Sequence, residues 1–147
     1  MNRLDQIDIL IVEDNPNDAE LIVRVLKKQH LANNIFIAED GEEALSFIFC
    51  RDKYSTRSKT NPPKAIFLDL KLPKINGLEV LKEIKSDKET KKLPVVIVTS
   101  SKEDPDIKAA YELGANSYVV KPVEFDAFIH AVSNAGLYWL VVNEPAK

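Results

Sequence analysis

Four short runs of apolar residues in this chain each end in charged or hydroxyl side chains. Runs rich in Val and Ile are typical of strands buried on both faces, as in a parallel sheet covered by helices. In an open sheet of that kind, ligands bind at the carboxyl ends of the strands. The runs are 9–12 before Glu13 and Asp14, 65–68 before Asp69, 95–98 before Thr99 and Ser100, and 117–120 before Lys121 and Pro122. Parallel neighbours would bring these side chains to one edge of the sheet.

Stretches with a helical period lie between the runs, and a further short strand is expected over residues 33–38. Typical helix-start residues precede the first four helices: Asn15 with Pro16, Asp40 with Gly41, Gly77, and Asp104 with Pro105. The alternation predicts an α/β, flavodoxin-like doubly wound fold with a five-stranded parallel sheet in the order 2-1-3-4-5 and five helices. In that order Asp14 and Asp69 lie side by side.

The last two helices carry more detailed expectations. Asp104 is expected to cap the fourth helix, Gly114 to close it, and its inner face to be formed by Ile107, Ala110 and Tyr111. The inner face of the fifth helix is expected to be Phe125, Phe128, Ile129 and Val132.

The length of 147 residues suits a single domain, with a core over about residues 7–135, a surface-loop insertion at 51–63 and an apolar extension at 136–147. The net charge of −3 gives no general attraction to nucleic acid or to an anionic membrane. Cys50 is the only cysteine, and the N-terminus has no signal-peptide pattern. The longest apolar run, 137–142, is too short to span a bilayer, so a cytoplasmic protein is expected.

Two carboxylates after the first strand and one after the third predict a site for Mg²⁺. Magnesium prefers hard oxygen ligands and is usually held by one or two carboxylates together with phosphate oxygens. A metal here would neutralise charge as a phosphoryl group arrives. One acid alone would more simply be a solvated loop residue or a helix cap. Glu13, Asp14 and Asp69 together favour the metal site.

The other side chains at this edge suit a phosphoryl group. Lys121 can reach phosphate oxygens, and Pro122 permits a cis peptide that would aim it. The hydroxyl of Thr99 or Ser100 can donate a hydrogen bond to a phosphoryl oxygen. Each has a plainer interpretation, as a solvated lysine before a turn proline or as a hydroxyl-rich turn. Tyr118 is expected to be half-buried in its strand.

Asp14, Asp69, Thr99, Tyr118 and Lys121 resemble the five signature positions of the receiver domains of two-component response regulators, the CheY-like family. Segment 68–77, with its Pro and Gly, resembles the phosphorylation loop of that family, and 112–118 resembles its approach to the fifth strand. The resemblance extends over about residues 7–135. The spacing from Asp14 to Asp69 is longer than usual because of the insertion.

The resemblance implies that Asp69 is the phosphoacceptor. The carboxylates of Asp14 and Asp69 and the backbone carbonyl of Lys71 would bind Mg²⁺, with Glu13 acting through water. The protein would not be a conventional enzyme, although it would catalyse its own phosphorylation and dephosphorylation.

The resemblance also implies a switch. Thr99 and Lys121 would hold the phosphoryl oxygens, and movement of Thr99 would let Tyr118 turn inward. That would reshape the surface formed by helix four, strand five and helix five. Lys71 and Ser101, each two residues after a signature residue, would tune the lifetime of the acyl phosphate.

No output domain is expected after the fifth helix. The insertion and the apolar end resemble the small stand-alone regulators paired with bacterial phytochromes. The implied partner is a sensor histidine kinase, and a bacterial phytochrome is among the candidates. Binding of this chain to DNA or to a membrane is not expected. The segment 137–142 is expected either to support a homodimer, together with helix four, strand five and helix five, or to fold onto its own core.

The insertion region contains cations, namely Arg51, Lys53, Arg57, Lys59 and the neighbouring Lys64. A solvated, mobile surface loop is the favoured interpretation, with docking to an acidic kinase surface as the alternative.

Two other functions remain to be weighed. A hydrolase with an aspartyl nucleophile, of the haloacid-dehalogenase type, would need a second acid two residues after Asp69, where Lys71 stands. A degenerate receiver that only scaffolds partners would be expected to lack signature residues, and all five are present.

Overall fold

The computed structural model describes residues 7–28, 34–58, 61–122 and 124–134. Its sheet has five parallel strands in the order β2-β1-β3-β4-β5, which confirms the predicted topology. The strands are β1 (Ile9–Val12), β2 (Ile35–Ala38), β3 (Ala65–Leu68), β4 (Val95–Thr99) and β5 (Ser117–Val120). The helices are α1 (Pro16–Lys28), α2 (Gly41–Ile48), α3 (Gly77–Ser86), α4 (Asp104–Glu112) and α5 (Phe125–Asn134), with a short 3-10 helix η2 (Asp52–Tyr54) after α2.

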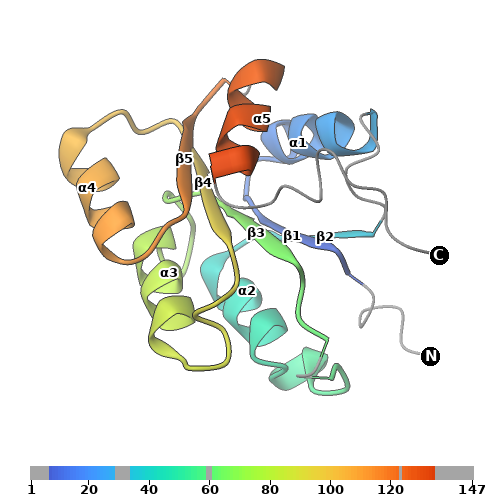
Figure 1. The fold of residues 1–147 in the computed structure, drawn as a ribbon. Helices are drawn as coiled ribbons and strands as arrows, with labels where there is room; N and C mark the ends of the chain where they lie inside the picture. The colour runs from blue at the N-terminus through green and yellow to red at the C-terminus, as the bar shows by residue number, and fades with distance from the viewer. Residues whose placement is uncertain (1–6, 29–33, 59–60, 123, 135–147) are drawn as a thin grey trace.

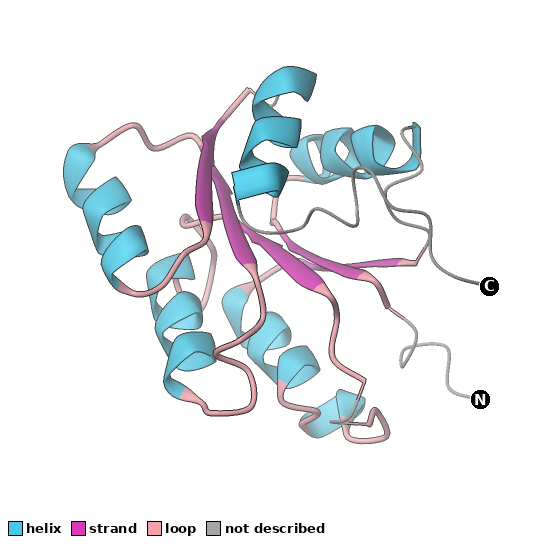
Figure 2. Ribbon diagram, in the orientation of Figure 1, coloured by secondary structure: helices cyan, strands magenta, loops and turns pink. Residues whose placement is uncertain are grey.

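The sheet lies between two layers of helices (Figures 1 and 2). Helices α1 and α5 cover one face, and α2, α3 and α4 cover the other. Successive strand residues point to opposite faces. In β1, Ile9 and Ile11 therefore pack with α1 and α5, while Leu10 and Val12 pack with α2 and α3. All four are fully buried, which is why this strand reads as an unbroken apolar run.

The strand register sets up the functional edge. Val12, the last residue of β1, pairs with Leu68, the last residue of β3. The backbone N–H of Asp69 donates to the carbonyl of Val12 at 3.0 Å, so the chain segments after both strands leave the sheet together. On the other side of β3, β4 ends at Thr99, which pairs with Val120 of β5.

The insertion is packed onto α2, so the prediction of a solvated, mobile loop is wrong for its central residues. Tyr54 and Arg57 are buried, with 5% and 4% of their surfaces exposed. The Arg57 guanidinium lies 3.8 Å from the centroid of the Phe47 ring and donates to the backbone carbonyl of Phe47. The Tyr54 hydroxyl donates to the Glu43 carboxylate at 2.6 Å. Lys59 and the extension 136–147 lie outside the described residues.

Two details of α4 also differ from expectation. Asp104 is the first helical residue and not the cap; the cap position is Glu103, which makes no side-chain capping bond. The Ser101 hydroxyl accepts from the Glu103 N–H at 3.3 Å, so it bonds the cap residue itself. Tyr111 is 50% exposed and lies beside Tyr118, with 6.4 Å between ring centroids, so it is not a core residue.

Ile107 is only half-buried, whereas Gly114, Ala110 and Phe128 meet the expectations for the last two helices. Gly114 follows the end of α4 with a φ of +108°, the left-handed conformation that glycine adopts readily. Ala110 and Phe128 are fully buried. The side chains of Phe125, Ile129 and Val132 lie outside the described part of the chain.

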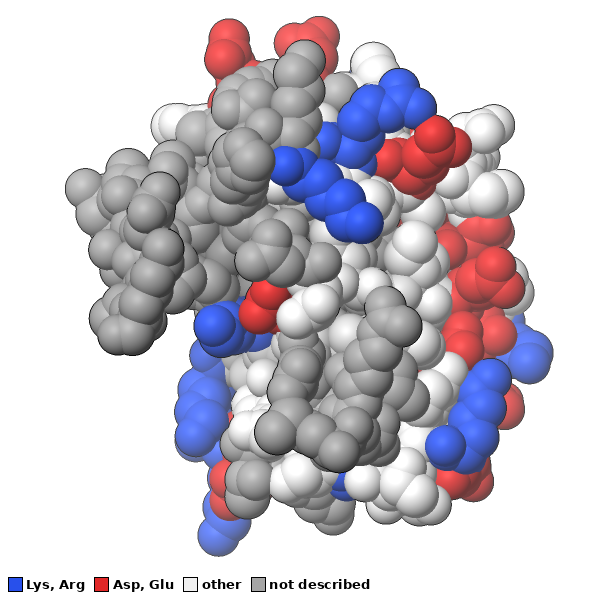
Figure 3. Space-filling view, turned by 90° about the vertical axis from the view of Figure 1, so that its right-hand side faces the viewer, with Lys and Arg blue, Asp and Glu red and all other residues white. Residues whose placement is uncertain are grey.

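The surface shown in Figure 3, which is the right-hand side of Figure 1, carries acidic and basic side chains interspersed. This agrees with the small net charge of −3. Among the described residues, no helix combines the length and the apolar character needed to cross a membrane.

Candidate metal and phosphoryl site

Three carboxylates converge where β1 and β3 end. Glu13, Asp14 and Asp69 each offer an oxygen atom, and these atoms all lie within 4.8 Å of one another. Glu13 and Asp69 are buried, with 2% and 6% of their surfaces exposed, while Asp14 is exposed. The arrangement has a buried side and a solvent side. It confirms the expectation that carboxylates from the first and third strands meet at this edge.

The backbone around Asp69 is held closely. The Lys71 N–H donates to Asp69 Oδ1 at 3.2 Å, and the Gly77 N–H donates to the carbonyl of Leu70 at 2.8 Å. A Cβ atom at Gly77 would overlap the backbone carbonyl of Asp69, so the start of α3 can approach this loop only with glycine. The resemblance assigned the Lys71 carbonyl to the metal, and that assignment stays a prediction.

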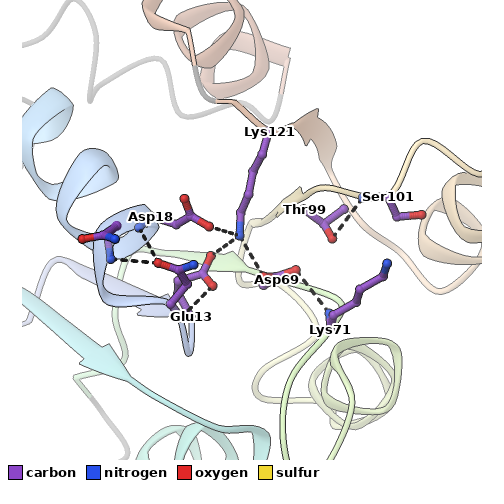
Figure 4. Close-up of polar contacts among 9 residues, drawn as sticks. Glu13, Asp18, Asp69, Lys71, Thr99, Ser101 and Lys121 are labelled. Carbon is purple, nitrogen blue, oxygen red and sulfur yellow. Dashed lines mark hydrogen bonds and ion pairs between the residues drawn. The ribbon is translucent and has the colours of Figure 1, made fainter.

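Lys121 enters the site from the end of β5 (Figure 4). Its Nζ atom lies 2.6 Å from Glu13 Oε1 and 2.9 Å from Asp69 Oδ2. A third carboxylate, Asp18 Oδ2 in the first turn of α1, also accepts from Nζ at 2.9 Å. The peptide between Lys121 and Pro122 is cis, as the sequence allowed.

The close charges change the proton affinities of both groups. Burial raises the pKa of Glu13 to about 7, and the neighbouring Asp69 charge adds to the rise, although the Lys121 ammonium opposes it. Burial alone would lower the pKa of Lys121. Its bonds to Asp18, Glu13 and Asp69 outweigh that effect and hold the pKa above its ordinary value. Lys121 is therefore a fixed cation of the site.

On the other side of Asp69, Thr99 and Ser101 connect the site to the α4 and β5 region. Thr99 is fully buried, and its hydroxyl accepts from the Ser101 N–H at 3.5 Å. The Tyr118 hydroxyl donates to the Ser101 carbonyl at 3.0 Å, and the Ser101 hydroxyl donates to Asp106 at 2.5 Å. Tyr118 is half-buried, as expected for its strand position, and burial raises the pKa of its hydroxyl. Ser100, the alternative hydroxyl, is exposed.

The sequence interpretation missed Asp18. It follows Asp14 by four residues and lies in the first helical turn after β1, so it starts at the same edge of the sheet. An acid in a first helical turn is also expected simply because it interacts favourably with the helix dipole. Its contact with Lys121, 103 residues further along the chain, depends on the fold and could not be derived from the spacing.

The donor set fits a hard divalent cation. The convergent ligands are carboxylate oxygens, with none of the sulfur donors that would favour a softer metal. Asp14 faces solvent, which leaves room for the waters that Mg²⁺ retains. The adjoining ammonium and hydroxyl groups are suited to an anionic group placed beside that cation.

Comparisons with known proteins agree with this chemistry. Residues 9–133 match the family model described as the response regulator receiver domain. The response regulator Rcp1 of Synechocystis sp. is 36% identical over 132 residues, which cover 90% of this chain and 88% of Rcp1.

Solved structures show the same likeness. The bacteriophytochrome response regulator AtBRR has a TM-score of 0.81 and 46% identity, and the match covers 92% of this chain and 96% of AtBRR. The phosphorylated cyanobacterial phytochrome response regulator RcpA has a TM-score of 0.74 and 33% identity, over 94% of this chain and 95% of that chain. The Mn²⁺-bound form of Rcp1 has a TM-score of 0.77, over 94% of this chain and 98% of that chain.

Proposed function

Because this chain belongs to the response regulator receiver domain family, we propose that it is the phosphorylation switch of a two-component system, with Asp69 as the phosphoacceptor. It is a response regulator and not a conventional enzyme. The observation that supports the proposal most strongly is the convergence of three carboxylates within 4.8 Å, with the Lys121 ammonium 2.9 Å from Asp69.

The chemical step is phosphoryl transfer. An oxygen of the Asp69 carboxylate attacks the phosphorus of a phosphohistidine on the kinase, the P–N bond breaks, and an acyl phosphate forms. Asp14, Asp69 and the Lys71 carbonyl would hold Mg²⁺, with Glu13 acting through water, and the bound cation would neutralise charge on the phosphoryl oxygens.

The residues of the chain orient and stabilise the transferred group. Lys121 donates to one phosphoryl oxygen, since its ammonium already lies within hydrogen-bond distance of Asp69. The Thr99 hydroxyl, which accepts from the Ser101 N–H, donates to another, and we expect it to move towards the phosphoryl group. That movement reaches Tyr118 through the Ser101 carbonyl and changes the surface of α4, β5 and α5. Lys71 and Ser101 set how long the acyl phosphate lasts.

The phosphodonor is a sensor histidine kinase, and a bacterial phytochrome is the favoured candidate. Support comes from AtBRR, described as a bacteriophytochrome response regulator, and from RcpA, described as a cyanobacterial phytochrome response regulator. A homodimer through α4, β5 and α5 is proposed on the strength of the family resemblance. The apolar segment 137–142, its other predicted contact, lies outside the described residues.

Phosphorylation by a small donor tests the assignment. With Mg²⁺ and acetyl phosphate, the protein should gain one phosphoryl group by mass spectrometry, and chelating the metal should prevent it. Asp69→Asn should lose the labelling because its amide is a poor nucleophile. The matched control, Asp126→Asn, removes an exposed carboxylate from α5 and should label normally. Unchanged labelling of Asp69→Asn would reject Asp69 as the acceptor, and failure of the unaltered protein to bind Mg²⁺ would favour a scaffolding receiver.

A further inference from the structure

Lys121 has three carboxylate partners, and only two of them belong to the metal-site cluster. Its ammonium donates hydrogen bonds to Asp18 and Asp69 and forms a close ion pair with Glu13 Oε1. Glu13 and Asp69 are members of the cluster that would hold a divalent cation, whereas Asp18 is not. The Lys121 side chain is 12% exposed, so little water is available to replace a lost partner.

Glu13 and Asp69 would therefore interact with two cations, the Lys121 ammonium and the divalent metal ion. In the structure both contact the Lys121 ammonium, at 2.6 Å and 2.9 Å. A divalent cation beside the same carboxylates repels the ammonium and competes with it for their charge. The affinity for the metal is higher if Lys121 can stay hydrogen-bonded to another carboxylate. Asp18 is the remaining one of its three partners, at 2.9 Å.

The position of Asp18 is fixed by the start of α1. The Asn15 side-chain oxygen accepts from the N–H groups of Asn17 and Asp18, at 2.9 Å and 3.2 Å, so the first turn is capped. The Asp18 side chain is 35% exposed, against 1% for Glu13 and 7% for Asp69, so it is the outermost of the three partners. It can therefore keep its bond to Lys121 while the inner carboxylates change partners.

We propose that Asp18 is a positioning residue that retains the Lys121 ammonium at the site while Glu13 and Asp69 exchange it for a divalent cation. This inference rests on the proposed function, since it assumes that the cluster binds Mg²⁺. It adds that Asp18 acts through Lys121 and not as a metal ligand.

A double-mutant cycle on Mg²⁺ affinity, measured by titration calorimetry, tests the coupling. In Asp18→Asn, Lys121 keeps only Glu13 and Asp69 as charged partners and competes with the metal for them, so binding should weaken roughly threefold to fivefold, the range expected for a partly exposed ion pair. In a Lys121→Gln background the same change should have no effect. Asp18→Glu, which keeps the charge, should bind more tightly than Asp18→Asn.

The matched control is Glu20→Gln. It removes one negative charge from the same helix, where Glu20 is exposed and pairs with Arg24 at 2.7 Å. It should leave the affinity unchanged. Equal weakening by Asp18→Asn in both backgrounds would overturn the inference, because Asp18 would then act on the metal as a general charge.

The ammonium itself gives a second readout that does not depend on phosphorylation. Proton exchange is slow for a buried ammonium that is hydrogen-bonded to carboxylates. The ¹H–¹⁵N signal of Lys121 should therefore be visible in protein prepared without metal. It should persist when Mg²⁺ is added to the unaltered protein and disappear when Mg²⁺ is added to Asp18→Asn. Its loss from the unaltered protein on adding Mg²⁺ would overturn the role of Asp18.

Mg²⁺ binding by the unaltered protein distinguishes an error about the metal site from an error about Asp18. If the unaltered protein does not bind Mg²⁺ at millimolar concentrations, the metal site and this inference are both wrong. If it binds Mg²⁺ and Asp18→Asn binds equally well, the metal site stands and only the role of Asp18 is wrong.

Discussion

Glu13 shows how burial gives a common residue a specific property. The position of an acid after an apolar run was enough to predict that Glu13, Asp14 and Asp69 would meet, because register places the ends of β1 and β3 side by side. The sequence could not predict how deeply Glu13 is buried, or that Lys121 and Asp18 would form a bonded pair. Those properties depend on which side chains the fold brings within about 3 Å of one another, the ordinary length of a hydrogen bond.

The raised pKa of Glu13, about 7, predicts a pH-dependent metal affinity. A proton on Glu13 removes a charge from the site, so Mg²⁺ affinity should increase as the pH rises through about 7 and level off above it. Calorimetric titrations across this range would measure it. Glu13→Gln should bind more weakly at high pH and lose the dependence. A flat profile in the unaltered protein would contradict the prediction.

The raised pKa of Glu13 also affects the stability of the fold. The sign is opposite to that for an acid whose pKa is lowered on folding. The folded protein binds the Glu13 proton more tightly than the unfolded chain, in which the carboxyl has its ordinary pKa of 4.5. In the absence of metal, the contribution of Glu13 to the free energy of unfolding should therefore fall as the pH rises between 4.5 and about 7. Urea unfolding of the unaltered protein and of Glu13→Gln across this range would measure the difference.

At the scale of elements, local signals predicted the strands and most helix starts but not the insertion. Nothing in the order of residues 51–63 shows that Arg57 stacks on Phe47, since that contact requires α2 and the insertion to be already folded against each other. The α4 cap differs for a similar reason. Asp104 and Pro105 resemble a cap, but the helix begins at Asp104 itself, and Glu103 before it is bonded to the Ser101 hydroxyl that follows β4.

Arg57 should be the main anchor of the insertion. Arg57→Ala removes the stacking on Phe47 and the bonds to the carbonyls of Phe47 and Asn61, and it should lower the free energy of unfolding by about 2 kcal/mol. Urea unfolding measures this. Arg51→Ala is the control, because Arg51 is exposed and lies 4.8 Å from the Phe49 ring; about 0.5 kcal/mol or less is expected. Equal effects of the two changes would mean that the insertion is not anchored by Arg57.

At the scale of the whole molecule, the sheet separates two apolar cores and carries the candidate site at one edge. The order β2-β1-β3-β4-β5 was predictable because continuous Val and Ile runs indicate burial on both faces and crossover connections are right-handed. The path from Thr99 through Ser101 to Tyr118 and Asp106 was only partly predictable. The resemblance supplied Thr99 and Tyr118, and the structure supplied the bonds of Ser101 that join them to α4.

That path predicts where a phosphoryl mimic acts. Adding beryllofluoride with Mg²⁺ should change amide hydrogen exchange in the loop from Thr99 to α4 and in β5, because movement of Thr99 disturbs its contact with the Ser101 N–H. The insertion around Arg57 should exchange as before, since it lies against α2. Changes limited to the Asp69 loop would contradict the proposed connection to α4.

Side chains far apart in the sequence should form one cation site. Anomalous diffraction from crystals grown with Mn²⁺, a hard cation with similar oxygen ligands, would locate the ion. We expect an ion bound among Glu13, Asp14 and Asp69, with Lys121 still bonded to Asp18. An ion bound elsewhere, with the Lys121 ammonium still on Glu13 and Asp69, would show that these carboxylates do not form the cation site.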